Sequence, residues 1–198
     1  MDTPEARDDA APLRIGLLSD VHDHVHALRR ALPWLREHSD VLLVLGDLIA
    51  PFVMKQLAKG YQKPVHVVFG NNDGDTHRLC ATAAGFAHVR VHGELFRNVL
   101  GNRAVVAQHY PGSADVIDPS AADLVAFGHD HRARCWRRGD AWFVNPGALM
   151  GYDPVIDADV SASWAVYDSE AHEVRFWRLC EGGVEEWDPA DEGFAGSR

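Results

Sequence analysis

The stretch LRIGLLSDVH, residues 13–22, begins with an apolar run that leads into Ser-Asp, and it ends in a histidine two residues after that aspartate. A short apolar run without polar alternation is typical of a strand that is buried on both faces. Residues 24–38 then carry large apolar side chains at spacings of three and four, which predicts an amphipathic helix. Pro33 lies inside that pattern, and we expect it to kink or divide the helix because proline has no backbone N–H.

The same strand-to-turn pattern recurs twice further along the chain. It appears in DVLLVLGD, residues 40–47, and in PVHVVFGNND, residues 64–73, with a predicted helix over 51–59 between them. Strands that alternate with helices predict parallel βαβ units and therefore an α/β fold. A helical stretch near 75–84 follows. The rest of the chain is rich in short Val-, Phe- and Trp-containing segments that predict a largely antiparallel sheet: 87–92, 94–99, 103–109, 123–128, 134–138, 141–145, 163–168 and 173–179.

Composition and charge are those of an ordinary globular domain. The chain has 198 residues, 46% hydrophobic and 24% charged, and no apolar run approaches the roughly 20 residues that span a bilayer. A formal net charge of −10 disfavours binding to a nucleic-acid backbone. No secretory signal is evident and the three cysteines form no C-x-x-C pair, so we expect a cytoplasmic location. We expect residues 1–12 to be a disordered tail, 13–180 to form one domain and 181–198 to be a loose acidic tail.

Polar side chains with metal-binding chemistry follow each of the apolar strands. Because ligands bind beyond the carboxyl ends of strands in open α/β sheets, these residues are expected to meet at one edge. Carboxylate, carboxamide and imidazole groups without thiolate suit Mn²⁺, Fe²⁺ or Zn²⁺. Seven such residues are too many for one tetrahedral zinc ion, whereas two ions that share one carboxylate would use them all. The candidates are Asp20, His22, Asp47, Asn71, His109, His129 and His131.

The order D-x-H, G-D, G-N-x-D, a single His and G-H-x-H resembles the calcineurin-like metallophosphoesterases. The short chain, GNND in place of G-N-H-D/E, and NPGAL at 145–149 resemble the small YfcE-like phosphodiesterase branch. The resemblance implies a four-layer α/β/β/α sandwich with two divalent metal ions, Mn²⁺ first, with Fe, Zn or Ni as alternatives. It further implies one ion on Asp20, His22 and His131, a second on Asn71, His109 and His129, and Asp47 as the bridge.

The same resemblance implies a phosphodiesterase that hydrolyses a small phosphorylated molecule. A hydroxide between the two ions would be the nucleophile, with Asp47, Asn71 and His109 as catalytic residues. Asp73 is expected to orient a ligand imidazole, and Asn72 and His24 are candidates for contact with the substrate. His24 and His26 are expected on different faces of the following helix, His26 in solvent. Relatives often self-associate, so a homo-oligomer is a further expectation.

One departure from the family pattern bears on the chemistry. Many relatives have a catalytic histidine where this chain has Asn72, supported by an aspartate where it has Ala50. General acid catalysis typically contributes 10²–10⁴-fold, so substrates with good leaving groups are expected to be favoured.

Other readings of the same motifs stay open at this point. Taken singly, Asp47 could be a helix N-cap and GNND an ordinary turn. The fold also supports a non-catalytic protein-binding scaffold, as in Vps29 of retromer. Within catalysis, a phosphomonoesterase or a nucleotide pyrophosphatase is the alternative to a phosphodiesterase.

Overall fold

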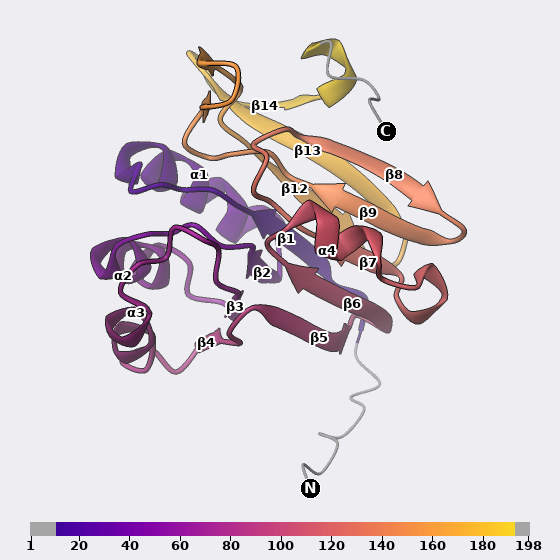
Figure 1. Ribbon diagram of the computed structural model, residues 1–198, viewed down its shortest axis with the longest axis horizontal. Coiled ribbons are helices and arrows are strands. Elements are labelled where there is room, and N and C mark those ends of the chain that lie inside the picture. Colours follow the sequence, from indigo (N-terminus) through magenta and orange to yellow (C-terminus); the bar gives the residue numbers. More distant parts are fainter. Residues whose placement is uncertain (1–10, 193–198) are drawn as a thin grey trace, which may run out of the picture.

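The structure, a computed structural model, describes residues 11–192 (Figure 1). Seven strands form its first sheet, in the order β14-β13-β12-β1-β2-β3-β4. Strands β1 to β4 are parallel, and β12, β13 and β14 continue the sheet from the other side of β1, each antiparallel to its neighbour. The bounds are β1 Arg14–Leu18, β2 Val41–Val44, β3 Val65–Val67, β4 Val89–Val91, β12 Ser163–Asp168, β13 Glu173–Cys180 and β14 Gly183–Trp187.

Five strands form the second sheet, in the order β5-β6-β7-β9-β8. The three central strands are parallel, and only the outer strands β5 and β8 pair antiparallel with their neighbours. The prediction of a largely antiparallel second half is therefore wrong for the centre of this sheet. Parallel neighbours need a crossover of about a dozen residues, and 109–123 supplies one between β6 and β7. The bounds are β5 Leu95–Leu100, β6 Arg103–Gln108, β7 Leu124–Ala126, β8 Arg134–Arg138 and β9 Ala141–Asn145.

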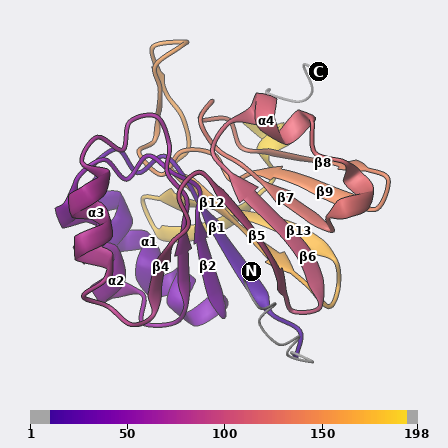
Figure 2. The same ribbon diagram turned by 60° about the horizontal axis from the view of Figure 1, so that its bottom comes forward.

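Helices cover the outer face of each sheet, and the two sheets pack against each other (Figure 2). Helices α1 (Val25–His38), α2 (Pro51–Gly60) and α3 (Thr76–Ala83) pack on the first sheet. On the second sheet lie α4 (Pro111–Asp115) and a 3₁₀ turn (Pro119–Ala121). Ala114 of α4 and Ala122, which directly follows the turn, belong to a small apolar cluster. The predicted four-layer α/β/β/α sandwich is confirmed, with a thin fourth layer.

Strand β1 shows why a continuous apolar run is needed at the centre. Ile15 and Leu17 point into the core between the sheets, whereas Leu18 packs under the helices. Gly16 faces α1, where a methyl group would crowd Leu35 and Leu42. Both faces are buried, so each position must be apolar or small.

Two expectations about single elements need correction. Helix α1 is not divided at Pro33, because that residue lies on the exposed face while the opposite face is held by buried apolar contacts. The segment from residue 181 to Glu192 is ordered, in contrast to the loose tail that was expected. Strand β14 pairs with β13 at the sheet edge, and a 3₁₀ turn follows over Pro189–Glu192. Residues 193–198 and most of the predicted N-terminal tail lie outside the described residues.

A small hairpin, β10 (Tyr152–Asp153) and β11 (Ala158–Asp159), projects from the edge where the parallel strands end. Of the helices within residues 11–192, none has the length and apolar character to cross a membrane.

Candidate metal centre

Five loops bring the seven predicted ligands to one edge of the two sheets. Each loop follows the carboxyl end of a parallel strand, where open α/β sheets form their binding sites. The loops after β1, β2, β3, β6 and β7 supply, in that order, Asp20 and His22, Asp47, Asn71, His109, and His129 with His131.

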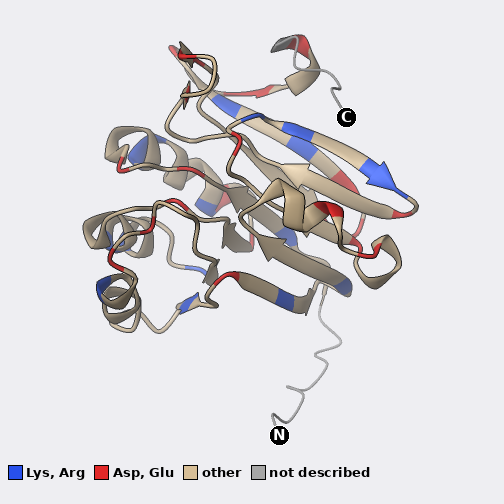
Figure 3. Cartoon of the chain, viewed as in Figure 1, with Lys and Arg blue, Asp and Glu red and all other residues tan. Residues whose placement is uncertain are grey.

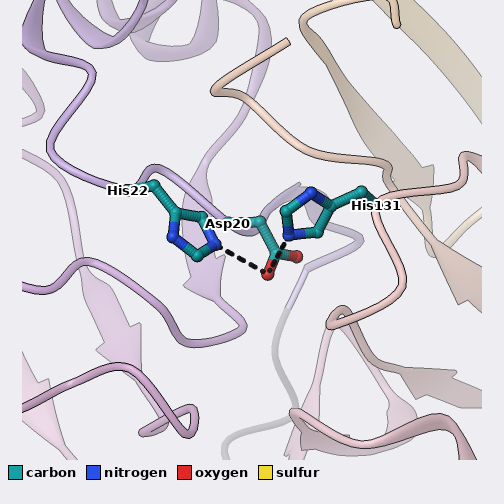
Figure 4. A group of neighbouring side chains, drawn as sticks. All are labelled: Asp20, His22 and His131. Atoms are coloured by element: carbon teal, nitrogen blue, oxygen red, sulfur yellow. Dashed lines mark ion pairs between the residues drawn. The ribbon is translucent and has the colours of Figure 1, made fainter. Parts of the chain in front are cut away.

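Asp20, His22 and His131 form one compact group, named the Asp20 half (Figure 4). Asp20 Oδ1 lies 3.7 Å from His22 Nε2 and 3.4 Å from His131 Nε2. Asp20 is fully buried, and its Oδ2 accepts a hydrogen bond of 3.0 Å from the backbone N–H of His129. Asp20 Oδ1 and His22 Nε2 are both buried without a hydrogen-bond partner. Buried polar atoms cost free energy when unpaired, and a cation would satisfy both.

Asn71, His109 and His129 form a second group, named the Asn71 half. Asn71 Oδ1 lies 3.0 Å from His109 Nε2 and 2.9 Å from His129 Nδ1. The two imidazole nitrogens are themselves 3.3 Å apart. Three donor atoms of the expected chemistry therefore converge on one point.

Asp47 lies between the two halves. Its Oδ2 is 3.4 Å from His22 Nε2 of the first half and 3.4 Å from His109 Nε2 of the second. Asn72 holds the carboxylate in this position by donating from its backbone N–H to Oδ1 and from its side-chain amide to Oδ2, both at 2.8 Å. A carboxylate with imidazoles of both halves around it has the position that a bridging ligand requires.

Two backbone carbonyls fix the orientation of two imidazoles. His109 Nδ1 lies 2.7 Å from Leu45 O, and His131 Nδ1 lies 2.6 Å from Tyr152 O. Because a carbonyl only accepts, each Nδ1 carries the proton and Nε2 keeps its lone pair toward the centre when the ring is neutral. This arrangement is common for histidines that ligate metals.

Backbone strain is concentrated in the predicted ligands. A positive φ is uncommon outside glycine, costs on the order of 1 kcal/mol or more, and clusters at functional sites. Five of the seven candidates adopt it: φ is 51° at Asp20, 43° at His22, 55° at Asp47, 79° at His129 and 61° at His131.

Two glycines of the motifs allow the ligands to approach each other. A methyl group at Gly70 would collide with Asp47 Oδ1, and one at Gly128 would collide with Ser19 Oγ and Asp20 Oδ2. The glycines of G-N-x-D and G-H-x-H therefore provide space for carboxylates that come from other loops.

Asp73 stabilises the strained loop around Asp47. Its carboxylate accepts hydrogen bonds from the backbone N–H groups of Asp47 at 3.0 Å, Ile49 at 2.9 Å and Gly70 at 2.8 Å. Ile49, a β-branched residue, has a φ of 75°. The structure thus shows Asp73 holding backbone, whereas we had expected it to orient an imidazole.

The pKa shifts at the centre follow from burial and charge. Burial alone would raise the pKa of the Asp20 carboxyl, but the neighbouring imidazoles of His131 and His22 outweigh it and hold that pKa far below its usual value. Burial likewise opposes ionisation of Asp47, whose pKa is nevertheless lowered, chiefly by His109. Burial would lower the pKa of His109 and His131, and their carboxylate neighbours raise it. Both carboxylates are therefore charged near neutral pH, the form that binds a cation.

The donor set fits divalent cations. Ligand atoms of Asp20, His22 and His131 lie within 4.8 Å of one another, as do those of Asp20, Asp47 and His109. Oxygen and imidazole donors without thiolate suit Mn²⁺, Fe²⁺, Zn²⁺ and similar ions.

Comparison with known proteins identifies the family. Residues 13–170 match the model of the calcineurin-like phosphoesterase superfamily domain. The chain belongs to this superfamily. A phosphodiesterase of Methanocaldococcus jannaschii is 24% identical over 144 residues, which cover 71% of this chain and 86% of that protein.

Solved structures share the fold at low identity. A structure described as a novel archaeal phosphodiesterase has a TM-score of 0.75 at 22% identity, covering 84% of this chain and 99% of that one. Vacuolar protein sorting 29 of Cryptosporidium parvum has a TM-score of 0.65 at 16% identity, with 90% and 97% covered. YfcE, a phosphoesterase from E. coli, has a TM-score of 0.62 at 17% identity, covering 88% of this chain and 97% of that one. The predicted resemblance to the superfamily and its YfcE-like branch is confirmed; the likeness to these structures shows the fold alone.

Sequence reasoning missed several features that surround this phosphoesterase centre. The carbonyls of Leu45 and Tyr152 carry no side-chain signal, so only coordinates reveal them. His26 is exposed, as expected, but sequence reasoning did not show that His24 and His26 line one groove beside the centre. That groove is formed partly by residues 150–162, more than 100 positions away in the chain, which no local pattern connects to α1.

Proposed function

We propose that this protein is a dinuclear metal-dependent phosphodiesterase that hydrolyses a small-molecule phosphodiester in the cytoplasm. The observation that carries the proposal is the position of Asp47, whose Oδ2 lies 3.4 Å from an imidazole of each half. The two unpaired buried atoms of the Asp20 half support it, since a cation is the partner that would satisfy a carboxylate oxygen and an imidazole nitrogen together.

The Asp20 half would hold one ion and the Asn71 half the other, with Asp47 shared. Mn²⁺ is the proposed ion, with Fe, Zn or Ni as alternatives that accept the same donors. Bound divalent ions supply Lewis-acid charge for the phosphoryl oxygens and make hydroxide available near neutral pH.

Residues of the chain contribute positioning more than proton transfer. Asn72 occupies the place of the general acid of many relatives, but its amide carries no titratable proton and is committed to Asp47. Departure of the leaving group therefore lacks an acid at this position. We propose that esters of acidic alcohols and phenols are preferred, and that the rate falls steeply as the pKa of the leaving group rises across aryl phosphodiesters.

A protein-binding scaffold on the same fold is the alternative, because the fold alone is shared with vacuolar protein sorting 29. The strained ligands argue against it. A scaffold has no need of five positive φ angles at residues that carry metal-binding groups, each of which lowers stability.

Hydrolysis of bis-p-nitrophenyl phosphate and of p-nitrophenyl phosphate, with Mn²⁺ and with EDTA, tests the proposal. We expect Mn²⁺-dependent turnover, faster on the diester, and a loss of at least about 1000-fold in Asp47→Asn. Asp140→Asn, an exposed aspartate between β8 and β9, is the matched control and should keep full activity. Equal activity of wild type and Asp47→Asn would overturn the catalytic assignment. Faster turnover of the monoester would favour a phosphomonoesterase.

A further inference from the structure

A groove of about 830 Å³ opens beside the Asp20 half, between helix α1 and the segment 150–162. One wall includes two histidines and an arginine from α1 and its N-cap, and the other includes part of the hairpin β10–β11 with its flanks. The residues that matter for the argument are His24, His26, Arg30, Met150, Gly151 and Asp159.

The groove adjoins the Asp20 half, because each residue of that half has a chain neighbour or a hydrogen-bond partner in the lining or next to it. His24 lies two residues after the ligand His22. The Met150 N–H donates to Asp20 O at 3.0 Å. Gly151 directly precedes Tyr152, whose carbonyl accepts from His131 at 2.6 Å. A substrate arm that extends from the centre toward α1 would reach the groove.

Arg30 carries the one permanent positive charge of the lining, in a protein whose net charge is −10 with its histidines neutral. His24, His26 and Arg30 face one acidic residue of the lining, Asp159, and the first turn of α1 contains no acidic residue. Figure 3 shows basic residues on α1, β8 and β13, and acidic residues on the hairpin β10–β11, on β14 and in the loops.

Arg30 is held at the far end of the groove. Its Nη2 donates to Cys180 O at 2.6 Å, which fixes the guanidinium and leaves other N–H groups for a ligand. Arg30 is six residues beyond His24, about 9 Å along the helix axis. A guanidinium presents paired N–H donors that match a phosphate group.

We propose that the groove binds a second phosphate group, carried on one ester arm of the substrate, with Arg30 as its main contact. The inference rests on the proposed phosphodiesterase function and names its substrate class: a phosphodiester whose arm bears a terminal phosphate. Arg30 is a specificity-determining residue in this assignment and takes no part in the bond-breaking step.

Two thymidine compounds that differ by one phosphate test the assignment. The substrates are the p-nitrophenyl ester of thymidine 5′-phosphate and the same ester with a 3′-phosphate. We expect the 3′-phosphate to raise kcat/KM at least 10-fold, mainly through KM, and Arg30→Gln to reduce this preference at least 5-fold. Arg29→Gln is the matched control, since Arg29 donates to Gln56 away from the groove, at 3.2 and 3.1 Å. An unchanged preference in Arg30→Gln, or no preference in wild type, would overturn the proposal.

Binding without turnover separates this inference from the proposed function. Calorimetry with thymidine 3′,5′-bisphosphate and thymidine 5′-phosphate should show at least 10-fold tighter binding of the bisphosphate, reduced in Arg30→Gln and kept in Arg29→Gln. That result without hydrolysis of either ester would support the groove and reject the phosphodiesterase. Hydrolysis of both esters with equal binding of the two nucleotides would do the reverse.

Discussion

The Asp20 half and the Asn71 half of the centre share Asp47 but differ in burial. Asp20 is fully buried and His131 is 5% exposed, whereas in the Asn71 half only His109 is buried and Asn71 and His129 are exposed. An ion in the Asp20 half would be surrounded by protein, and one in the Asn71 half would face solvent. Interactions between charges are stronger where water is excluded.

The halves also differ in charge and in what their donor atoms already do. The Asp20 half has two carboxylates when Asp47 is counted, and the Asn71 half has one. Asp20 Oδ1 is unpaired, but Asn71 Oδ1 already lies at hydrogen-bond distance from His129 Nδ1, and an ion must replace that contact. We therefore expect the two ions to bind with different affinities, the tighter one in the Asp20 half.

The largest effect should come from Asp20→Asn. The carboxamide keeps the shape and an acceptor for the His129 N–H but removes a buried charge from the tighter site. Affinity for the tight ion should fall at least about 100-fold and turnover about 1000-fold. Calorimetric titration of metal-free protein with Mn²⁺ and the Mn²⁺ content after dialysis measure this. If Asp20→Asn kept the tight ion and a change of Asn71 lost it, the tighter site would be the Asn71 half and not the Asp20 half.

The next effect concerns the loop that positions the shared carboxylate. Asp73→Ala removes the acceptor of three backbone N–H groups, two of them in the strained stretch after β2. We expect the free energy of unfolding of the metal-free protein to fall by about 3 kcal/mol. Asp75→Ala removes a helix N-cap acceptor of Arg78 N–H and should cost about 1 kcal/mol. Urea denaturation of both variants measures the two losses of unfolding free energy. Equal losses would show that Asp73 stabilises the protein no more than an ordinary helix cap does.

Sequence reasoning grouped the candidate ligands of both halves because each follows a strand, and strand ends are visible as changes from apolar to polar residues. Asp20, Asp47 and Asn71 follow three parallel neighbours, so their convergence at one edge is a consequence of topology. The apolar run likewise predicted that both faces of β1 are buried, as Ile15, Leu17 and Leu18 show.

What sequence reasoning could not supply depends on partners that are distant in the chain. Pro33 stays helical because contacts on the opposite face of α1 hold the helix, and β14 is ordered because β13 provides a pairing edge. The difference between the halves was hidden for the same reason: burial of Asp20 and exposure of Asn71 are set by which loops cover them.

A smaller effect should follow from Asn71→Ala, which removes a neutral donor from the weaker site. The affinity of the second ion should fall about 10-fold while the tight ion is retained. Asn71→Asp adds the carboxylate that this half lacks and should tighten the second ion, which brings the two affinities together. Calorimetric titration of Mn²⁺ resolves both steps. If Asn71→Asp bound the second ion no more tightly than wild type does, the difference in affinity between the halves would come from burial and not from charge.

The smallest effect lies outside the centre, where histidines lack the carboxylate neighbours that both halves provide. His66 Nδ1 and His92 Nε2 are 2.8 Å apart, and both rings contact Phe96. Burial, with His92 and Arg90 nearby, lowers the pKa of His66 to about 4. The unfolded chain, with a histidine pKa near 6.5, therefore binds more protons between these values, so stability is complete above about pH 6.5 and falls as the pH drops.

We expect His66→Asn, which cannot take up this proton, to lose less stability between pH 7.5 and 5 than wild type, by about 1 kcal/mol after allowance for partial exposure of the ring. Urea denaturation in EDTA measures it, because the chelator keeps metal binding out of the comparison. His77→Asn, at an exposed position of α3, should follow wild type. A parallel pH dependence of His66→Asn and wild type would mean that the ring already accepts its proton in the folded state. Burial without a neighbouring carboxylate would then not keep a histidine neutral in this fold. The raised pKa values of His109 and His131 could then no longer be contrasted with a lowered pKa at His66.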